Sequence, residues 1–195
     1  MRALVISGGG SKGAFAGGVA QYLLEKEKNK YDIFIGTSTG SLLIPHLALG
    51  NIDKIYSIYT EVDMDKIFNV NPFIVKNKNG MDIVTINHLN VIWQFLKRKR
   101  TFGESKRLLK YIKKSFTVTD FEQLKALKTD ILITVTNLSK NEAEYKSIHE
   151  CTYDEFCEWI WISSNYIPFM SLVLKDGFDY GDGGPLSSGH SAHQK

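Results

Sequence analysis

The feature that most constrains this chain is a pair of short apolar runs, each of which breaks into a glycine-rich turn. The first run lies in MRALVISGGGSKG at the start of the chain, and the second lies in YDIFIGTSTGSLL, which begins at Tyr31. Both runs are rich in β-branched residues, and helix-forming sequence follows each turn. The order predicts two strand–turn–helix units, with strands at 4–6 and 33–35, in a parallel arrangement.

The remaining elements follow from the same patterns. Helices are expected at 14–28, 41–50, 52–62 and 86–99, a loop at 73–80, and later strands at 130–138 and 142–150. Thr101, Thr119 and Thr152 each precede a Glu by three residues, and this capping-box pattern predicts three further helix starts. The fold class predicted is α/β, a three-layer α/β/α sandwich with a mostly parallel central sheet.

Length and composition are those of one folded domain. The chain has 195 residues, 43% of them hydrophobic and 23% charged. We assign the domain to residues 1–186 and expect the polar stretch 187–195 to be a disordered or artificial tail. Cys151 and Cys157 lie six apart within one predicted helix, which separates them around its axis and predicts neither a disulfide nor a metal site. The apolar run at the start is too short for a signal segment, so a cytoplasmic location is expected.

The charge is distributed unevenly along the chain. Residues 97–114 carry nine Lys or Arg and one Glu, within a net charge of +3 for the whole chain. Leu108, Leu109, Ile112 and Phe116 form an apolar stripe beneath this charge, as on the buried side of an ordinary surface helix. Two interpretations therefore stay open, a solvated helix face and a surface that meets an anionic partner such as a membrane or a nucleic acid.

The first glycine turn fits two kinds of site. Gly8 to Gly13 satisfy G-x-G-x-x-G after a strand and before a helix, which is the context of a dinucleotide-binding loop. That loop also needs an acidic residue near the end of the second strand, which here ends Ile35-Gly36-Thr37. The lysine of a phosphate-binding P-loop follows the last glycine, whereas Lys12 precedes Gly13. A nucleotide-binding module remains the alternative from another functional class.

The second turn predicts a nucleophile. Gly36-Thr37-Ser38-Thr39-Gly40 is G-x-S-x-G, which places a serine on a sharp strand-to-helix turn at a helix N-terminus. A serine between glycines can also simply cap a helix. Because parallel strands end at the same edge of a sheet, the backbone N–H groups of Gly9 and Gly10 are expected to face a carbonyl oxygen under attack by Ser38.

Three motifs together resemble the patatin-like phospholipase family. They are the G-G-G-x-[K/R]-G loop at 8–13, the G-x-S-x-G turn at 36–40, and D-G-G at 182–184, in the family's order. The resemblance implies a lipid acyl hydrolase with a Ser38–Asp182 dyad, an oxyanion hole formed by Gly8, Gly9 and Gly10, and no metal or cofactor. This chain differs from the family's pattern in one respect. Family members usually continue well past D-G-G, whereas only PLSSGHSAHQK follows here.

The choice of Asp182 also has support from spacing. Asp176 and Gly177 form a favoured two-residue hairpin turn, and Asp179 alternates with aromatic residues and is expected to face solvent. Asp182 precedes two glycines that permit a close backbone approach. A Ser-His-Asp esterase with Ser38, Asp182 and either His190 or His193 remains the alternative within enzymes, although its serine turn normally follows more strands than one.

The resemblance also predicts the partners. It implies a lipid or phospholipid substrate and no nucleic acid, and the basic stretch 97–114 adds a peripheral contact with an anionic membrane. Lys12 is a candidate for binding a lipid phosphate. Five apolar residues of the middle segment could line an acyl groove or belong simply to the core: Phe68, Phe73, Ile74, Trp93 and Phe95.

Overall fold

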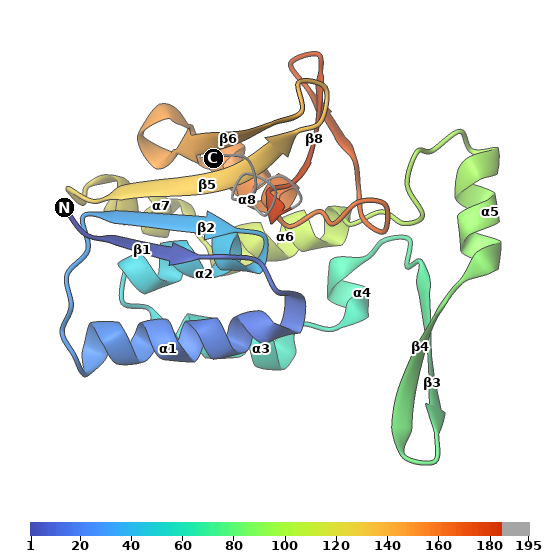
Figure 1. Ribbon diagram of the computed structural model, residues 1–195, viewed down its shortest axis with the longest axis horizontal. Helices are drawn as coiled ribbons and strands as arrows, with labels where there is room; N and C mark the ends of the chain where they lie inside the picture. Colours follow the sequence, from blue (N-terminus) through green and yellow to red (C-terminus); the bar gives the residue numbers. More distant parts are fainter. Residues whose placement is uncertain (185–195) are drawn as a thin grey trace, which may run out of the picture.

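The computed structural model describes residues 1–184 and consists, within that range, of a six-stranded sheet, a separate two-stranded hairpin, eight α-helices and two short 3₁₀ helices, Gly10–Lys12 and Ile148–Glu150 (Figure 1). The strands are β1 (Ala3–Ile6), β2 (Ile33–Thr37), β3 (Phe73–Lys78), β4 (Met81–Ile86), β5 (Asp130–Asn137), β6 (Glu142–Ser147), β7 (Val173–Lys175) and β8 (Phe178–Asp182). The helices are α1 (Gly13–Glu25), α2 (Thr39–Ala48), α3 (Ile52–Glu61), α4 (Met64–Ile67), α5 (His88–Leu96), α6 (Lys106–Ser115), α7 (Val118–Lys125) and α8 (Tyr153–Ser163).

The sheet is parallel over β1, β2 and β5, and antiparallel strands complete it. β6 pairs with one edge of β5, from Leu132 to Asn137. The other edge of β5 pairs first with β2 and then, from Val135 onward, with the antiparallel β8. The α/β class and the parallel central strands are as predicted.

The helices that pack on this sheet, α2 and α8 among them, lie on one face of it. The strand order β1-β2-β5 advances in one direction, and right-handed crossovers then put α1 and α2, which follow β1 and β2, on the same side. α2 packs on β2 and α8 packs on β5, where their side chains share one core with Leu4, Phe34 and Ile131. On the opposite face Val5 is 61% exposed.

Several local predictions are confirmed and others are wrong. α6 buries Leu108 and Ile112 while its basic residues face outward, as its periodicity indicates. The capping box at Thr152 is present. The capping box predicted at Thr119 is instead formed by Thr117 with Asp120, because α7 begins two residues earlier than predicted. No helix begins at Thr101, whose hydroxyl instead donates a hydrogen bond to the carbonyl of Gly103.

The loop predicted at residues 73–80 is wrong. These residues form β3 and the turn of a β-hairpin. Asn79 and Gly80 both have positive φ, 55° and 79°, as a two-residue hairpin turn requires. The hairpin and α5 extend away from the rest of the molecule (Figure 1).

The remaining predictions concern cysteines, membrane spans and the tail. Both cysteines are free and buried, with Cys151 just before α8 and Cys157 inside it. In the part of the chain that the structure describes, no helix has the length and apolarity to cross a membrane. The predictions for the tail and for the domain end at residue 186 lie outside the described residues.

We predict that Gly40→Ala destabilises the fold. A Cβ on Gly40 would lie 2.1 Å from the carbonyl oxygen of Ile6, a backbone atom that cannot move aside. The free energy of unfolding in urea should fall by about 1–3 kcal/mol or more. Gly18→Ala is the matched control, because a Cβ there meets nothing within 4 Å and the residue lies inside α1. It should raise stability by about 0.5–1 kcal/mol; equal effects of the two variants would contradict the packing argument.

Candidate active site

The register of β5 brings Ser38 and Asp182 together. Thr37, the last residue of β2, is opposite Thr134, and Asp182, the last residue of β8, is opposite the next residue, Val135. The two strands run toward each other along one edge of β5, so their carboxyl ends meet. The Oγ of Ser38 donates a hydrogen bond of 2.7 Å to Oδ2 of Asp182, across 144 residues of sequence.

Ser38 occupies a sharp turn that only small neighbours permit. Its φ of 54° and ψ of −124° are rare for a non-glycine residue and strained. Gly36 and Gly40 allow this turn because neither position has room for a Cβ. A Cβ on Gly36 would lie 2.7 Å from the carbonyl oxygen of Gly40, and one on Gly40 would lie 2.1 Å from that of Ile6. α2 begins at the next residue, Thr39, so Ser38 stands at the positive end of that helix.

Three serines hold the strained backbone of Ser38. Its N–H donates to the hydroxyl of Ser163 at 2.9 Å, and that hydroxyl donates in turn to the carbonyl of Thr134 at 2.7 Å. Its carbonyl accepts a hydrogen bond from Ser41 at 2.5 Å and a longer one, 3.3 Å, from Ser164. These positioning serines are not among the site residues predicted from the sequence; the pair Ser163-Ser164 at the end of a predicted helix was the available signal.

Asp182 is buried and accepts two hydrogen bonds. The second comes from the backbone N–H of Gly184, 2.7 Å from Oδ1. Only 5% of the residue is exposed, and this burial raises the pKa of the carboxyl group above its usual range, while the bonds from Gly184 and Ser38 act in the opposite direction. A higher pKa makes this carboxylate a better proton acceptor than a solvated one.

The first glycine turn lies against Ser38. A Cβ on Gly8 would be 2.5 Å from the Cβ of Ser38 and 3.1 Å from its Oγ, so only glycine fits this approach. Gly9 and Gly10 continue the turn along the same cavity, and Gly10 has a φ of 56°. Lys12 is exposed and is not among the residues that line the cavity.

Ser38 and Asp182 open onto a cavity of about 1020 Å³. Its far walls are mostly apolar and come from α2, α3, α6 and the segment around α4: Leu42, Ile58, Val62, Ile67, Phe68, Phe73, Leu108, Ile112 and Phe116. Of the five groove candidates, Phe68 and Phe73 line the cavity, whereas Ile74, Trp93 and Phe95 do not. His46 also lines it, and burial lowers the pKa of its imidazole to about 4, so it is neutral there.

Other chemistries have less support among residues 1–184. In that range no three His, Cys, Asp or Glu side chains come together as a metal ion would need. No histidine of the described residues hydrogen-bonds to Ser38, whose hydroxyl instead contacts Asp182 directly. His190 and His193 of the esterase alternative lie outside those residues.

The chain is similar in sequence and in fold to known proteins. The family model described as "Patatin-like phospholipase" matches residues 4–192. Among solved structures, VipD from Legionella pneumophila is similar with a TM-score of 0.61 and 18% identity. The match covers 95% of this chain and 46% of VipD, so the chain spans less than half of that protein's length. No curated protein sequence matches.

We predict that Asp182→Asn increases stability at neutral pH. The pKa of the carboxyl group is raised in the folded state, so its ionised form opposes folding. The wild-type protein therefore loses stability as the pH rises through the folded pKa and the carboxyl group ionises. Urea unfolding should therefore show a higher free energy for the variant, with a gap that narrows as pH is lowered. Asp179→Asn on the same strand is the control, since Arg100 holds the pKa of Asp179 below its usual range. A rise in that variant too would contradict the assignment to Asp182.

Proposed function

Because the chain belongs to the patatin-like phospholipase family, we propose that it hydrolyses acyl esters of lipids through a dyad of Ser38 and Asp182. The observation that carries the proposal is the 2.7 Å hydrogen bond from the Ser38 hydroxyl to the buried Asp182 carboxylate. A nucleophile within hydrogen-bond reach of its base is the arrangement that covalent acyl transfer needs. The apolar cavity beside it is large enough for an acyl chain.

The first half of the reaction forms an acyl-enzyme. Asp182 accepts the Ser38 proton as Oγ attacks the ester carbonyl carbon, and the carbonyl oxygen becomes an oxyanion. When the tetrahedral intermediate collapses, the bond from carbon to the alcohol oxygen breaks, and the leaving alkoxide takes the proton from Asp182.

The second half releases the fatty acid. Asp182 accepts a proton from water as that water attacks the acyl carbon, and the proton returns to Ser38 Oγ when its bond to the acyl group breaks. The raised pKa of Asp182 suits both directions of transfer.

Backbone N–H groups of Gly8, Gly9 and Gly10 are the proposed donors to the oxyanion. Their support is the closeness of the loop to Ser38, which a Cβ on Gly8 would prevent. Each such donor typically contributes about 10²- to 10³-fold in rate. Lys12, next to the cavity residue Ser11, remains a proposed partner for the phosphate of a phospholipid.

We predict that Ser38→Ala abolishes hydrolysis of p-nitrophenyl butyrate and labelling by a fluorophosphonate probe, because both need the Oγ nucleophile. EDTA should leave the wild-type rate unchanged. Ser11→Ala is the matched control, since Ser11 also lines the cavity but plays no part in the proposed chemistry. Full activity in the Ser38→Ala variant would overturn the nucleophile, and nucleotide binding without probe labelling would favour the other use of the Gly8–Gly13 loop.

The identity of the base has its own test. Asp182→Asn should lower the rate by at least about 10²-fold while the protein remains folded, because amide nitrogen cannot accept the serine proton. His190→Ala and His193→Ala should keep the wild-type rate. If either histidine variant is inactive and Asp182→Asn is active, the Ser-His-Asp esterase replaces the dyad.

A further inference from the structure

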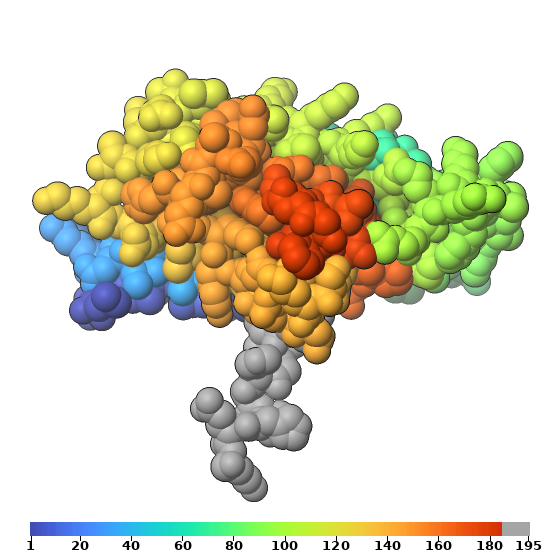
Figure 2. Space-filling view, turned by 90° about the horizontal axis from the view of Figure 1, so that it is seen from above, coloured from blue at the N-terminus to red at the C-terminus, as the bar shows by residue number. Residues whose placement is uncertain are grey.

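One segment of the molecule has its apolar side turned outward. We define the arm as residues 73–100, which contain the β3–β4 hairpin, α5 and the basic stretch that follows. The hairpin forms its own two-stranded sheet and pairs with no strand of the central sheet. The arm lies at one end of the elongated molecule in Figure 1, and Figure 2 shows the same end, in green, from above.

Helix α5 is oriented opposite to an ordinary surface helix. Its apolar residues follow the spacing i, i+3, i+4, i+7 and face solvent, with Leu89 75%, Ile92 55%, Trp93 61% and Leu96 69% exposed. Gln94, on the opposite side, is 2% exposed. A surface helix that buries a glutamine and exposes a contiguous apolar stripe is typical of a site that binds an apolar partner.

The hairpin adds to this apolar surface. Its exposed apolar side chains are Ile74, Val75, Met81, Ile83, Val84 and Ile86. Lysines lie among them on one face, because Lys76 is opposite Ile83 and Lys78 is opposite Met81. Isolated two-stranded hairpins are only marginally stable in water, so this one gains from contact with an apolar phase.

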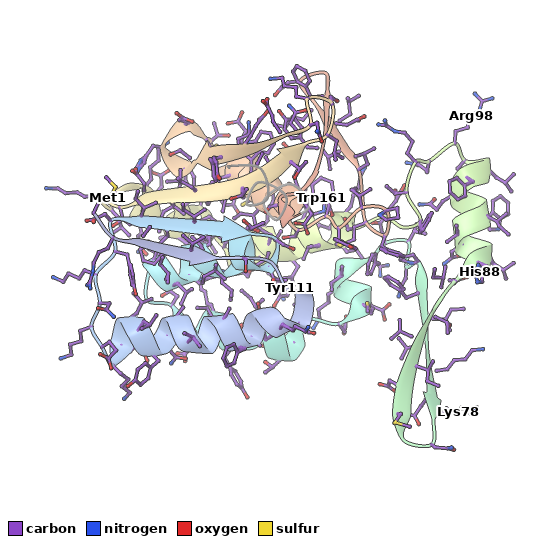
Figure 3. All side chains as sticks on the ribbon, viewed as in Figure 1. Met1, Lys78, His88, Arg98, Tyr111 and Trp161 are labelled. Carbon is purple, nitrogen blue, oxygen red and sulfur yellow. The ribbon has the colours of Figure 1, made fainter. Side chains whose placement is uncertain are left out.

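The arm is also strongly basic. It contains six Lys or Arg against a single Asp. Lys99 and Arg100 pair with Glu104 and Asp179, whereas no salt bridge among the described residues involves Lys76, Lys78, Lys97 or Arg98. Figure 3 shows Lys78 at the hairpin tip and Arg98 beyond the far end of α5, so a cation without a salt bridge to the described residues lies at each end of the arm.

A continuous row of aromatic rings joins the arm to the cavity. Phe95 of α5 contacts Phe102 at 5.9 Å between ring centroids, Phe102 contacts Phe169 at 5.6 Å, and Phe169 stacks on Phe73 at 5.2 Å. Phe73, the first residue of the hairpin, lines the cavity that contains Ser38. The aromatic row thus connects α5 to the wall of the cavity.

We propose that the arm docks on an anionic lipid bilayer, with α5 lying in the interface and its apolar stripe inserted among the acyl chains. This proposal rests on the proposed function, which requires lipid to reach the cavity. An exposed apolar stripe with an outward tryptophan and flanking cations is the pattern of interfacial helices. A protein surface would satisfy the apolar stripe too, but it would not account for the aromatic connection to the cavity.

The tryptophans provide a built-in probe. Trp93 is exposed, whereas Trp159 and Trp161 are 6% and 5% exposed. Vesicles of phosphatidylcholine with phosphatidylserine should shift the fluorescence of the Ser38→Ala protein to shorter wavelength, and Trp93→Phe in that background should remove the shift. A shift that survives Trp93→Phe, or no shift at all, would overturn the proposal.

Matched leucine variants separate the arm from general surface hydrophobicity. Leu96→Ser should weaken co-sedimentation with these vesicles by about 10-fold or more, because it removes one inserted side chain. Leu174→Ser is the control, since Leu174 is 68% exposed on β7, and it should bind as wild type. Binding should also fall with added salt and without phosphatidylserine; indifference to both would overturn the role of the cations.

Soluble substrate makes the two proposals distinguishable. Leu96→Ser should hydrolyse p-nitrophenyl butyrate at the wild-type rate and vesicle lipid more slowly. A protein that binds vesicles through Trp93 but cleaves no ester would overturn the proposed function and leave the arm. If the wild type forms a dimer that Leu96→Ser dissociates, and neither binds vesicles, a second copy of the chain covers the stripe and the lipid proposal is wrong.

Discussion

The proposed active site depends on one constraint, the register of the β5 ladder. β2 and β8 pair with the same edge of β5 in opposite directions, and their ends meet at Thr134 and Val135. Backbone hydrogen bonds therefore set the separation between Ser38 and Asp182 before any side chain interacts. A shift of β8 by one residue would turn Asp182 to the other face of the sheet, because side chains alternate along a strand.

Two residues of the proposed site lower the stability of the fold, and local hydrogen bonds partly offset the cost of each. Ser38 has a strained backbone, and Asp182 is a buried carboxylate whose pKa is raised by desolvation. The hydroxyls of Ser163 and Ser41 form hydrogen bonds with the backbone of Ser38, and the N–H of Gly184 donates a hydrogen bond to the carboxylate of Asp182. Local strain held by a surrounding hydrogen-bond network is characteristic of functional sites, where it preorganises reacting groups.

The sequence predicts the parts of the site that are local and misses those that depend on distant pairing. The turn around Ser38 is legible, because small residues at fixed positions are required there, and Asp182 follows from its two glycines and the family resemblance. The roles of Ser163 and Ser41 depend on how α8 meets α2, which no local pattern encodes.

The periodicity that correctly identified α5 as a helix could not tell which side faces the protein. For α6 the same pattern predicts the buried side correctly, since Ile112 is 2% exposed. For α5 it fails, because Gln94 is buried and Trp93 is exposed. An amphipathic pattern requires only that the apolar side leave water, and it does not specify the surface that covers it. In a chain whose proposed substrate is a lipid, the surface that covers an apolar stripe need not belong to the protein. The outward stripe of α5 therefore supports the proposal that the molecule acts at the surface of a lipid bilayer.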